Sequence, residues 1–299
     1  MKKLLLFVAL TLAVSNYCMS QEYMTSFDAA KRIALVQNKF LFMIWEDAAA
    51  IPYPVIMSDE NGRDVLISNM FDYDEINGII WDYFVPVKVN ESLYADLYNQ
   101  IKDSRSRNYV AQFEDDNIKI MDANGNIVNT SMSPEAYFNL SKFVSKYALN
   151  TSFLNAELKN YLLQKDFGTA YRLASKYLDY AILVDKTVRP DIINLAEIYL
   201  DEADKFLLED SATNKATFEQ KSRLLRLSKY LLQNRPNKVL SRLKKFKPSE
   251  INDANQALLS YLYYTSYQLK KDEGNAELWK AKVSEVDLRK SQLIINIHL

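Results

Sequence analysis

The residues best suited to chemistry in this chain are two adjacent acids, Glu46 and Asp47. Two carboxylates held about 5 Å or more apart can share general acid and general base work on one substrate. Adjacent acids after a strand also suit a solvated loop or a helix N-terminus, where the helix dipole favours negative charge. We expect this second arrangement, and a carboxylate-based hydrolase is the alternative.

A second candidate is a group of tyrosines within one predicted helix. Tyr261 and Tyr264 share one face of that helix, while Tyr263 and Tyr267 share another. Both faces cannot enter one core, so we expect one pair to be exposed. Exposed aromatic rings favour binding of a peptide, a glycan or a protein partner. Packing between helical hairpins is the plainer explanation.

Thiol and imidazole chemistry depend on only two residues, Cys18 and His298. Residues 1–20 resemble a secretory signal peptide, in which Lys2 and Lys3 precede a short apolar run and Ser20 marks the cleavage position. The run is too short to span a bilayer. A lipid anchor on Cys18 is disfavoured, because no small residue precedes it. We therefore predict an exported, periplasmic or extracellular protein that loses its only cysteine.

The loss of that cysteine narrows the possible activities. A chain without cysteine has no thiolate nucleophile and no CxxC pair. A lone His298 next to the last residue is a poor base or ligand. Ser-His-Asp triads, Cys-His triads and His/Cys zinc sites are thereby excluded. We predict no catalytic residue, no metal and no cofactor.

Composition points to an ordinary soluble protein. The chain has 37 basic and 38 acidic residues, 48% hydrophobic residues and 25% charged residues. It has no concentrated positive field for nucleic acid. No stretch after the predicted signal peptide is apolar enough to cross a membrane. A protein or a peptide is the expected partner.

The predicted mature chain divides near residue 150. Residues 21–149 mix helices with short β-type runs, and residues 150–299 are helical nearly throughout. In the first part we expect helices from Ser26 and from Pro134, which Ser133 caps. Asp122 to Asn126 contain an Asn-Gly turn between two apolar runs, and their spacing does not fit a calcium loop, because Gly125 is at position 4. The segment 58–62 likewise fits turn chemistry. The other predicted elements are a strand 40–45, a helix 75–83, a strand 84–89 and a hairpin 118–128.

Three segments in this order resemble a secreted thioredoxin-like domain. They are 26–30 with Asn38 and Lys39 before the first strand, 71–72 with the second strand, and 120–125 in the hairpin. The resemblance implies an α/β thioredoxin-like sandwich. It also implies a CxxC pair after the first strand, at Glu46 and Ala49 or at Ala50 and Tyr53. Neither pair contains cysteine. The cis-proline that the family places before the hairpin is missing from 115–117.

Helical periodicity dominates the second part. Leu154, Leu158, Tyr161 and Leu162 follow a helical spacing, as do Ala170, Ala174, Tyr177 and Leu178. Segment 172–178 recurs loosely at 226–231, which suggests tetratricopeptide-like helical hairpins, with an irregular bundle as the equal alternative. The basic run 242–247 fits an amphipathic helix with a solvated face. Further helices are expected at 191–208, 215–233, 237–246, 249–270 and 275–290.

The sequence thus predicts a redox-dead thioredoxin-like domain followed by an all-α helical-hairpin domain. Non-catalytic binding or scaffolding in the bacterial cell envelope is the expected function. The helical half and the loop 45–57, with Trp45, would carry it. A thioredoxin-family oxidoreductase relative that acts with a partner's cysteines is the alternative.

Overall fold

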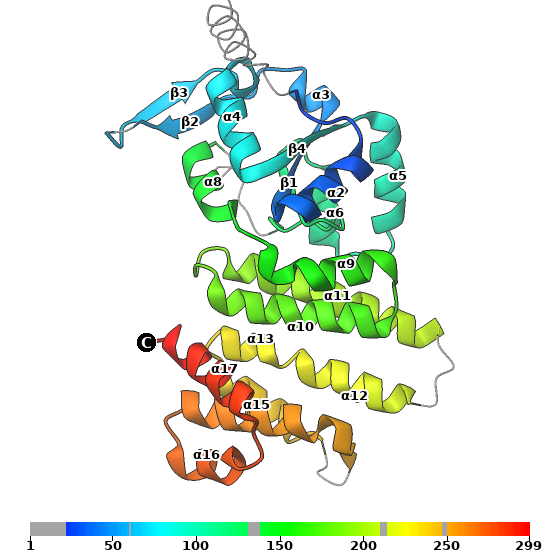
Figure 1. The fold of residues 1–299 in the computed structure, drawn as a ribbon, viewed down its shortest axis with the longest axis vertical. Helices are drawn as coiled ribbons and strands as arrows, with labels where there is room; N and C mark the ends of the chain where they lie inside the picture. Colours follow the sequence, from blue (N-terminus) through cyan, green and yellow to red (C-terminus); the bar gives the residue numbers. More distant parts are fainter. Residues whose placement is uncertain (1–21, 60, 131–137, 210–213, 247–249) are drawn as a thin grey trace, which may run out of the picture.

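The computed structural model describes residues 22–59, 61–130, 138–209, 214–246 and 250–299. It consists of a small α/β domain, from Phe27 to Tyr147, followed by a helical region that begins at Ser152. Figure 1 shows the helical region stacked below the α/β domain along the long axis of the molecule. The predicted signal peptide 1–20, and the predicted helix start at Ser133 and Pro134, lie outside the described residues.

A three-stranded mixed sheet forms the centre of the α/β domain, in the order β4-β1-β5. β1 (Phe40–Trp45) pairs in parallel with β4 (Phe84–Val89) and antiparallel with β5 (Lys119–Met121). Every residue of β1 is buried, which explains its unbroken apolar sequence. The parallel register places Trp45 opposite Val89, so both strands end at the same edge.

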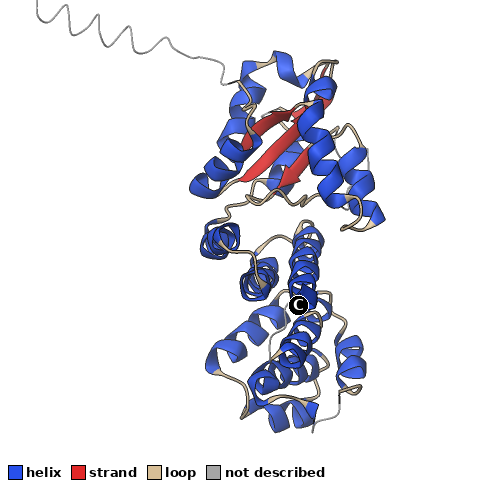
Figure 2. Ribbon diagram, turned by 90° about the vertical axis from the view of Figure 1, so that its right-hand side faces the viewer, coloured by secondary structure: helices blue, strands red, loops and turns tan. Residues whose placement is uncertain are grey.

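Helices flank this sheet on both sides, as Figure 2 shows. Ser26 caps the first helix as predicted, because its side chain accepts a hydrogen bond from the Ala29 amide. The predicted helix before β4 is also present. Two helices between β4 and β5 were not predicted. The helices of this domain are α2 (Phe27–Gln37), α3 (Glu46–Ala49), α4 (Asp74–Tyr83), α5 (Glu91–Ile101), α6 (Arg107–Glu114) and α8 (Leu140–Tyr147), with a 3-10 turn η1 (Met70–Asp72).

The hairpins differ from the sequence prediction in two ways. The turn predicted near residues 58–62 is present, since the Gly62 amide donates to the Asp59 carbonyl, but the two-stranded sheet that it joins, of β2 (Val55–Ser58) and β3 (Asp64–Ile67), was not predicted. In the predicted hairpin 118–128, the returning run forms only one bridge, between Met121 and Ile127. The turn itself is as predicted, with Gly125 at a φ of 88° that favours glycine.

In the helical region, the first helix, α9 (Asn155–Leu163), packs against a hairpin of two long helices, α10 (Phe167–Leu183) and α11 (Arg189–Glu209). Asp166 caps α10 through a capping box with Thr169. The predicted helix 215–233 breaks near Leu227, and the predicted helix 275–290 breaks near Val283. The elements are η2 (Ser152–Leu154), α9 (Asn155–Leu163), α10 (Phe167–Leu183), α11 (Arg189–Glu209), α12 (Lys215–Leu225), α13 (Ser228–Leu232), α14 (Pro236–Leu243), η4 (Asp253–Asn255), α15 (Gln256–Leu269), α16 (Glu273–Lys280) and α17 (Glu285–Asn296).

The periodic positions of the first helices are buried, with one exception. Ala170, Ala174, Tyr177 and Leu178 are all buried, but Leu162 is 40% exposed. Leu162 follows Tyr161 directly and lies on a different face of α9. Among the described helices, none combines the length and the apolar composition needed to span a membrane.

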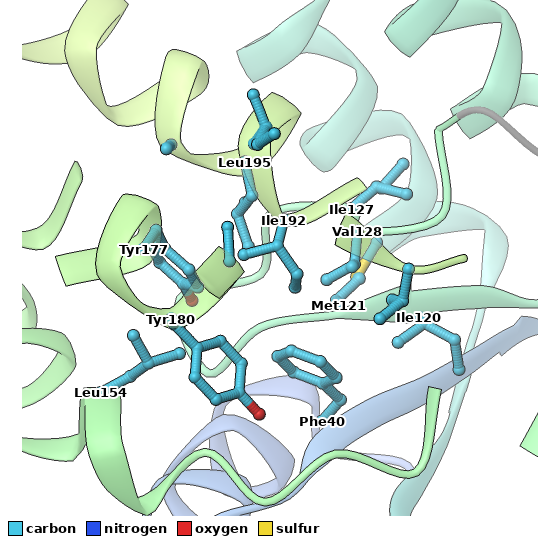
Figure 3. Packing of buried hydrophobic residues seen from close by; sticks show 14 of the residues in the cluster. Phe40, Ile120, Met121, Ile127, Val128, Leu154, Tyr177, Tyr180, Ile192 and Leu195 are labelled. Carbon is cyan, nitrogen blue, oxygen red and sulfur yellow. The ribbon is translucent and has the colours of Figure 1, made fainter. Parts of the chain in front are cut away.

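The two parts share one buried apolar cluster rather than meeting at a polar linker. Figure 3 shows side chains of both parts within this cluster. Those from the α/β domain include Phe40, Met121 and Ile127, and those from the helical region include Leu154 and Ile192. Each of these five side chains is at most 1% exposed.

Candidate functional site

A cleft of about 180 Å³ lies where β1 and β4 end. Ligands of open α/β sheets commonly bind outside the carboxyl ends of parallel strands, so this is the expected place for a site. The following residues line the cleft: Trp45, Glu46, Asp47, Ala48, Val89, Glu91, Tyr94, Glu114 and Asp116.

Of the four positions at which the resemblance would place a redox pair, Glu46 lines this cleft and Ala49, Ala50 and Tyr53 do not. Glu46 and Ala49 are the first and last residues of α3, which follows β1 without a linker. Glu46 is exposed and Ala49 is half-buried. Ala50 is the C-cap residue that follows α3, and Tyr53 belongs to the loop before β2. The first of the two registers therefore spans one helical turn, while the second runs into the loop at Pro52.

Trp45 forms the inner wall of the cleft, although it is only 6% exposed. Its ring packs edge-to-face against Tyr94, with 4.2 Å between the ring centroids, and against Phe113, with 5.1 Å. Its indole Nε1 donates a hydrogen bond to the Asp115 carbonyl oxygen at 3.1 Å. Trp45 therefore serves mainly to join β1 to the segment before β5.

Lys119 holds the same segment from within the sheet, and no role was predicted for this residue. Its ammonium group is buried and donates to the Asp115 carbonyl, to the Asp115 carboxylate at 2.6 Å and to the Asn117 carbonyl at 2.6 Å. Desolvation lowers the pKa of Lys119, and the Asp115 hydrogen bond opposes this change. The three donors are all used, so Lys119 acts as a structural tie. Its sequence signal was a lysine between two apolar residues of a buried strand.

The residues 115–117 replace the proline segment that the family resemblance would place here. Tyr53 adds a contact to it, since its hydroxyl donates to Asn117 Oδ1 at 3.3 Å. Burial raises the pKa of Tyr53 to about 12, so the hydroxyl keeps its proton. No cis peptide bond occurs in the described ranges of the chain. The segment is held by side chains rather than by proline geometry.

The chemistry that the cleft can support is set by five carboxylates, on Glu46, Asp47, Glu91, Glu114 and Asp116. Glu46 and Asp47 are exposed in the first turn of α3, as expected for a solvated helix N-terminus. Across the described parts of the chain, no group of three or more acidic or histidine side chains is arranged to hold a metal ion. The cleft repels anions and attracts cationic groups.

A second polar cluster joins the α/β domain to the helical region, and we call it the junction. Asp122 Oδ1 accepts hydrogen bonds from the Asn124 and Asn126 amides, which builds the predicted turn. Asp122 Oδ2 accepts hydrogen bonds from the hydroxyls of Tyr177, at 3.0 Å, and Tyr199. One fully buried carboxylate thus holds both the turn and the two long helices.

A half-buried ion pair extends the junction. Arg105, after α5, contacts Glu202 of α11 and donates to Asn126 Oδ1 at 2.9 Å. Tyr161 of α9 donates to the same Glu202 carboxylate. Three elements of the helical region are therefore anchored to two segments of the α/β domain.

The C-terminal tyrosines are not arranged as expected. Tyr261 is buried, and Tyr263, Tyr264 and Tyr267 are half-buried, so no exposed pair exists. Tyr263 stacks on Trp279 of α16, with 4.2 Å between ring centroids, and also stacks on Tyr267. The sequence interpretation was wrong on exposure because α16 turns back over this face of α15.

Comparison with models of known protein families finds no match, and neither curated proteins nor solved structures give a significant match.

Proposed function

We propose that this protein is a non-catalytic binding or scaffolding protein of the bacterial cell envelope, built on a degenerate thioredoxin-like domain. In this proposal the α/β domain caps the first helical hairpin, and the helical region presents the binding surface. Helical arrays need a terminal unit that covers their apolar end, because each hairpin buries only one side against its neighbour.

The thioredoxin-like assignment rests on element order and on the sheet. A strand-helix-strand unit with parallel β1 and β4 is followed by antiparallel β5 and a turn, which is the order that the sequence resemblance implies. α3 also starts directly after the first strand, where a redox pair would sit. The support is topological, and it concerns the fold and not the activity.

A catalytic role is disfavoured by what occupies that place. Glu46 and Ala49 cannot form a disulfide, and the segment 115–117 is tied down by Lys119 and Trp45. Thiol exchange requires a thiolate and access to the partner disulfide. The remaining polar groups are carboxylates on an open surface.

The junction is the single observation that carries the proposal. Asp122 is buried and Glu202 is half-buried, and each takes hydrogen bonds from both parts of the molecule. A redox domain that must approach varied partners gains nothing from such fixation. A scaffold benefits from this fixation, because it must present its surfaces in a constant relation to one another.

Affinity capture with the chain from residue 21 onward tests this proposal. The bait should retain a specific partner from envelope extracts and release it with unchanged mass. A matched bait with Glu46→Ala and Asp47→Ala should retain the same partner. Insulin reduction by the purified chain should stay at the uncatalysed rate.

Two results would contradict the binding role. Genuine turnover in the insulin assay would favour the oxidoreductase alternative. Hydrolysis of a captured protein by the wild type, lost in the double variant, would favour a carboxylate-based hydrolase. N-terminal sequencing of the native protein addresses export separately, and we expect it to begin at Gln21.

A further inference from the structure

A large cleft lies in the helical region, among α12, α13 and α14. Its volume is about 570 Å³, which is within the range of ligand-binding pockets. We call it the α12–α14 cleft. Its lining residues are Ala216, Gln220, Arg223, Arg226, Leu227, Lys229, Tyr230, Arg242, Lys245, Phe246 and Glu250.

Positive charge is concentrated around this cleft. Five of the lining side chains are basic, and Glu250 is the only acidic one. Arg226 and Lys229 are already paired with acids of α11, and the Arg226 guanidinium lies 2.7 Å from both Asp201 and Asp204.

The other three cations have no such compensation. Arg223, Arg242 and Lys245 are exposed, and the described residues form no ion pair with them. Arg223 comes from α12, whereas Arg242 and Lys245 belong to the basic run 242–247. The cations of that run that the structure describes are exposed, as expected for a solvated face, and they lie beside Arg223, which comes nineteen residues before Arg242 in the chain.

Aromatic rings hold these like charges close to one another. Tyr230 is buried, and the cationic groups of Lys229, Lys238 and Arg242 lie 5.4, 4.3 and 5.3 Å from its ring centroid. Arg223 lies 5.7 Å from the centroid of Phe246. Cation–π attraction offsets part of the repulsion, but Lys238 and Arg242 are spaced i,i+4 on α14, where like charges destabilise a helix. An anion in the cleft would remove this penalty.

The charge of the whole chain strengthens the local field. Residues 22–149 carry 19 acidic and 11 basic residues, whereas residues 150–299 carry 19 acidic and 24 basic residues. The total charge is near zero, but its two signs are separated along the molecule. The cleft belongs to the positive half, which favours the approach of an anionic ligand.

We propose that the α12–α14 cleft binds an acidic segment of a protein partner, with glutamate or aspartate carboxylates on the cations and an apolar side chain on the floor. Arginine guanidinium groups pair with carboxylates through two parallel hydrogen bonds. Leu227, Tyr230 and Phe246 supply an apolar floor. This inference rests on the proposed binding role and names its surface and ligand chemistry.

A cleft of this size fits a peptide segment better than it fits a nucleic acid. Nucleic-acid binding uses basic residues distributed along an extended track that follows many phosphates. Here the unpaired cations surround one hollow. The volume is large enough for a few peptide side chains and too small for a helical duplex.

Fluorescence anisotropy with a short labelled peptide, glutamate-rich with one central leucine, tests the assignment. The test variant carries Arg223→Gln, Arg242→Gln and Lys245→Gln. The charge-matched control carries Lys159→Gln, Lys186→Gln and Lys270→Gln, which are exposed and do not line the cleft. We expect the test variant to bind about ten-fold more weakly than the wild type, and the control to bind within about two-fold of it. A glutamine analogue of the peptide should not bind, and the wild-type affinity should fall with added salt.

Several results would overturn the assignment. These are unchanged peptide binding by the test variant, tighter binding of a single-stranded oligonucleotide of equal charge, or salt-sensitive self-association of the protein in place of peptide binding. Partner capture separates this inference from the proposed function. If the test variant still captures the partner that the wild type captures, only the cleft assignment fails. If the wild type captures nothing and binds no peptide, both fail.

Discussion

The Tyr199 hydroxyl, on the long helix α11, donates a hydrogen bond to the Asp122 carboxylate, which is in the turn after β5. The two residues are 77 positions apart in the chain, and both are completely buried. Tyr177 of α10 donates to the same carboxylate oxygen. This shared acceptor is the reason that we treat the α/β domain as a fixed cap of the helical region.

Removing one donor should weaken the whole molecule. We expect Tyr199→Phe to lower the free energy of unfolding by about 2 kcal/mol, because a buried carboxylate loses a partner that solvent cannot replace. Tyr83→Phe is the matched control, since Tyr83 is 49% exposed, and it should change the free energy by less than about 0.5 kcal/mol. Urea denaturation measures both. Equal effects of the two substitutions would contradict the role of the junction.

Titration of the Asp122 carboxyl should make the free energy of unfolding depend on pH. Desolvation raises the pKa of its carboxyl above the ordinary 3.8, so the folded protein holds the proton more tightly than the unfolded chain does. The resulting stabilisation is complete below pH 3.8 and is lost as the pH rises through the folded-state pKa. Asn cannot titrate.

The stability advantage of the wild type over Asp122→Asn should therefore shrink as the pH rises above about 4, and then become constant. Denaturation of both proteins across this pH range gives the difference directly. An advantage that grows with pH would mean that the hydrogen bonds from Tyr177 and Tyr199 outweigh desolvation.

Lys119 should control the segment 115–117. Lys119→Met removes the ammonium donor shared by the Asn117 carbonyl, the Asp115 carbonyl and the Asp115 carboxylate, of which the last two keep the Trp45 indole and the Asn117 amide as donors. We expect a loss of about 2 kcal/mol in stability. Hydrogen exchange of the peptide that contains residues 115–117 should become faster. Lys102→Met, at an exposed position, should leave this exchange unchanged. Unaltered exchange in the Lys119 variant would show that Trp45 alone holds the segment.

Introduced cysteines can test where a redox pair would sit in the proposed thioredoxin-like fold. Glu46→Cys with Ala49→Cys places two thiols one turn apart at the start of α3, where the first thiol should have a lowered pKa. We expect an intramolecular disulfide under mild oxidation, detected as a loss of two hydrogens by mass spectrometry. Ala50→Cys with Tyr53→Cys should stay reduced, because Pro52 extends the chain between them. A disulfide in the second pair only would assign the other register.

Local sequence pattern predicted the elements whose burial is uniform. The strands 40–45 and 84–89 have the predicted bounds, because the first is a continuous apolar run and the second is apolar except at Lys88. β2 and β3 were missed because they form a separate two-stranded sheet in which Val65 and Leu66 remain exposed. Their sequences therefore lack the alternation of apolar and polar residues that identifies a half-buried strand. The break between α16 and α17 has a readable signal, since Ser284 caps α17 and bonds the Asp287 amide.

The candidate sites were less predictable than the fold, because each is assembled from distant segments. Asp122 was read correctly as a turn residue, but nothing local indicates its bonds to Tyr177 and Tyr199. The basic run near Arg242 becomes part of a candidate site only because Arg223, from an earlier helix, lines the same cleft. Such relationships depend on how the helices pack, which hydrophobic periodicity alone does not determine.

The rigidity of the junction is the physical basis of the proposed function, and unfolding cooperativity tests it most directly. With Trp279→Phe, tryptophan fluorescence reports only on Trp45 and Trp81 in the α/β domain, while far-ultraviolet circular dichroism reports mainly on the helical region. We predict that the two signals follow one coincident transition in urea. Two separated transitions would show that the parts fold independently, and would contradict the account of the α/β domain as a fixed cap.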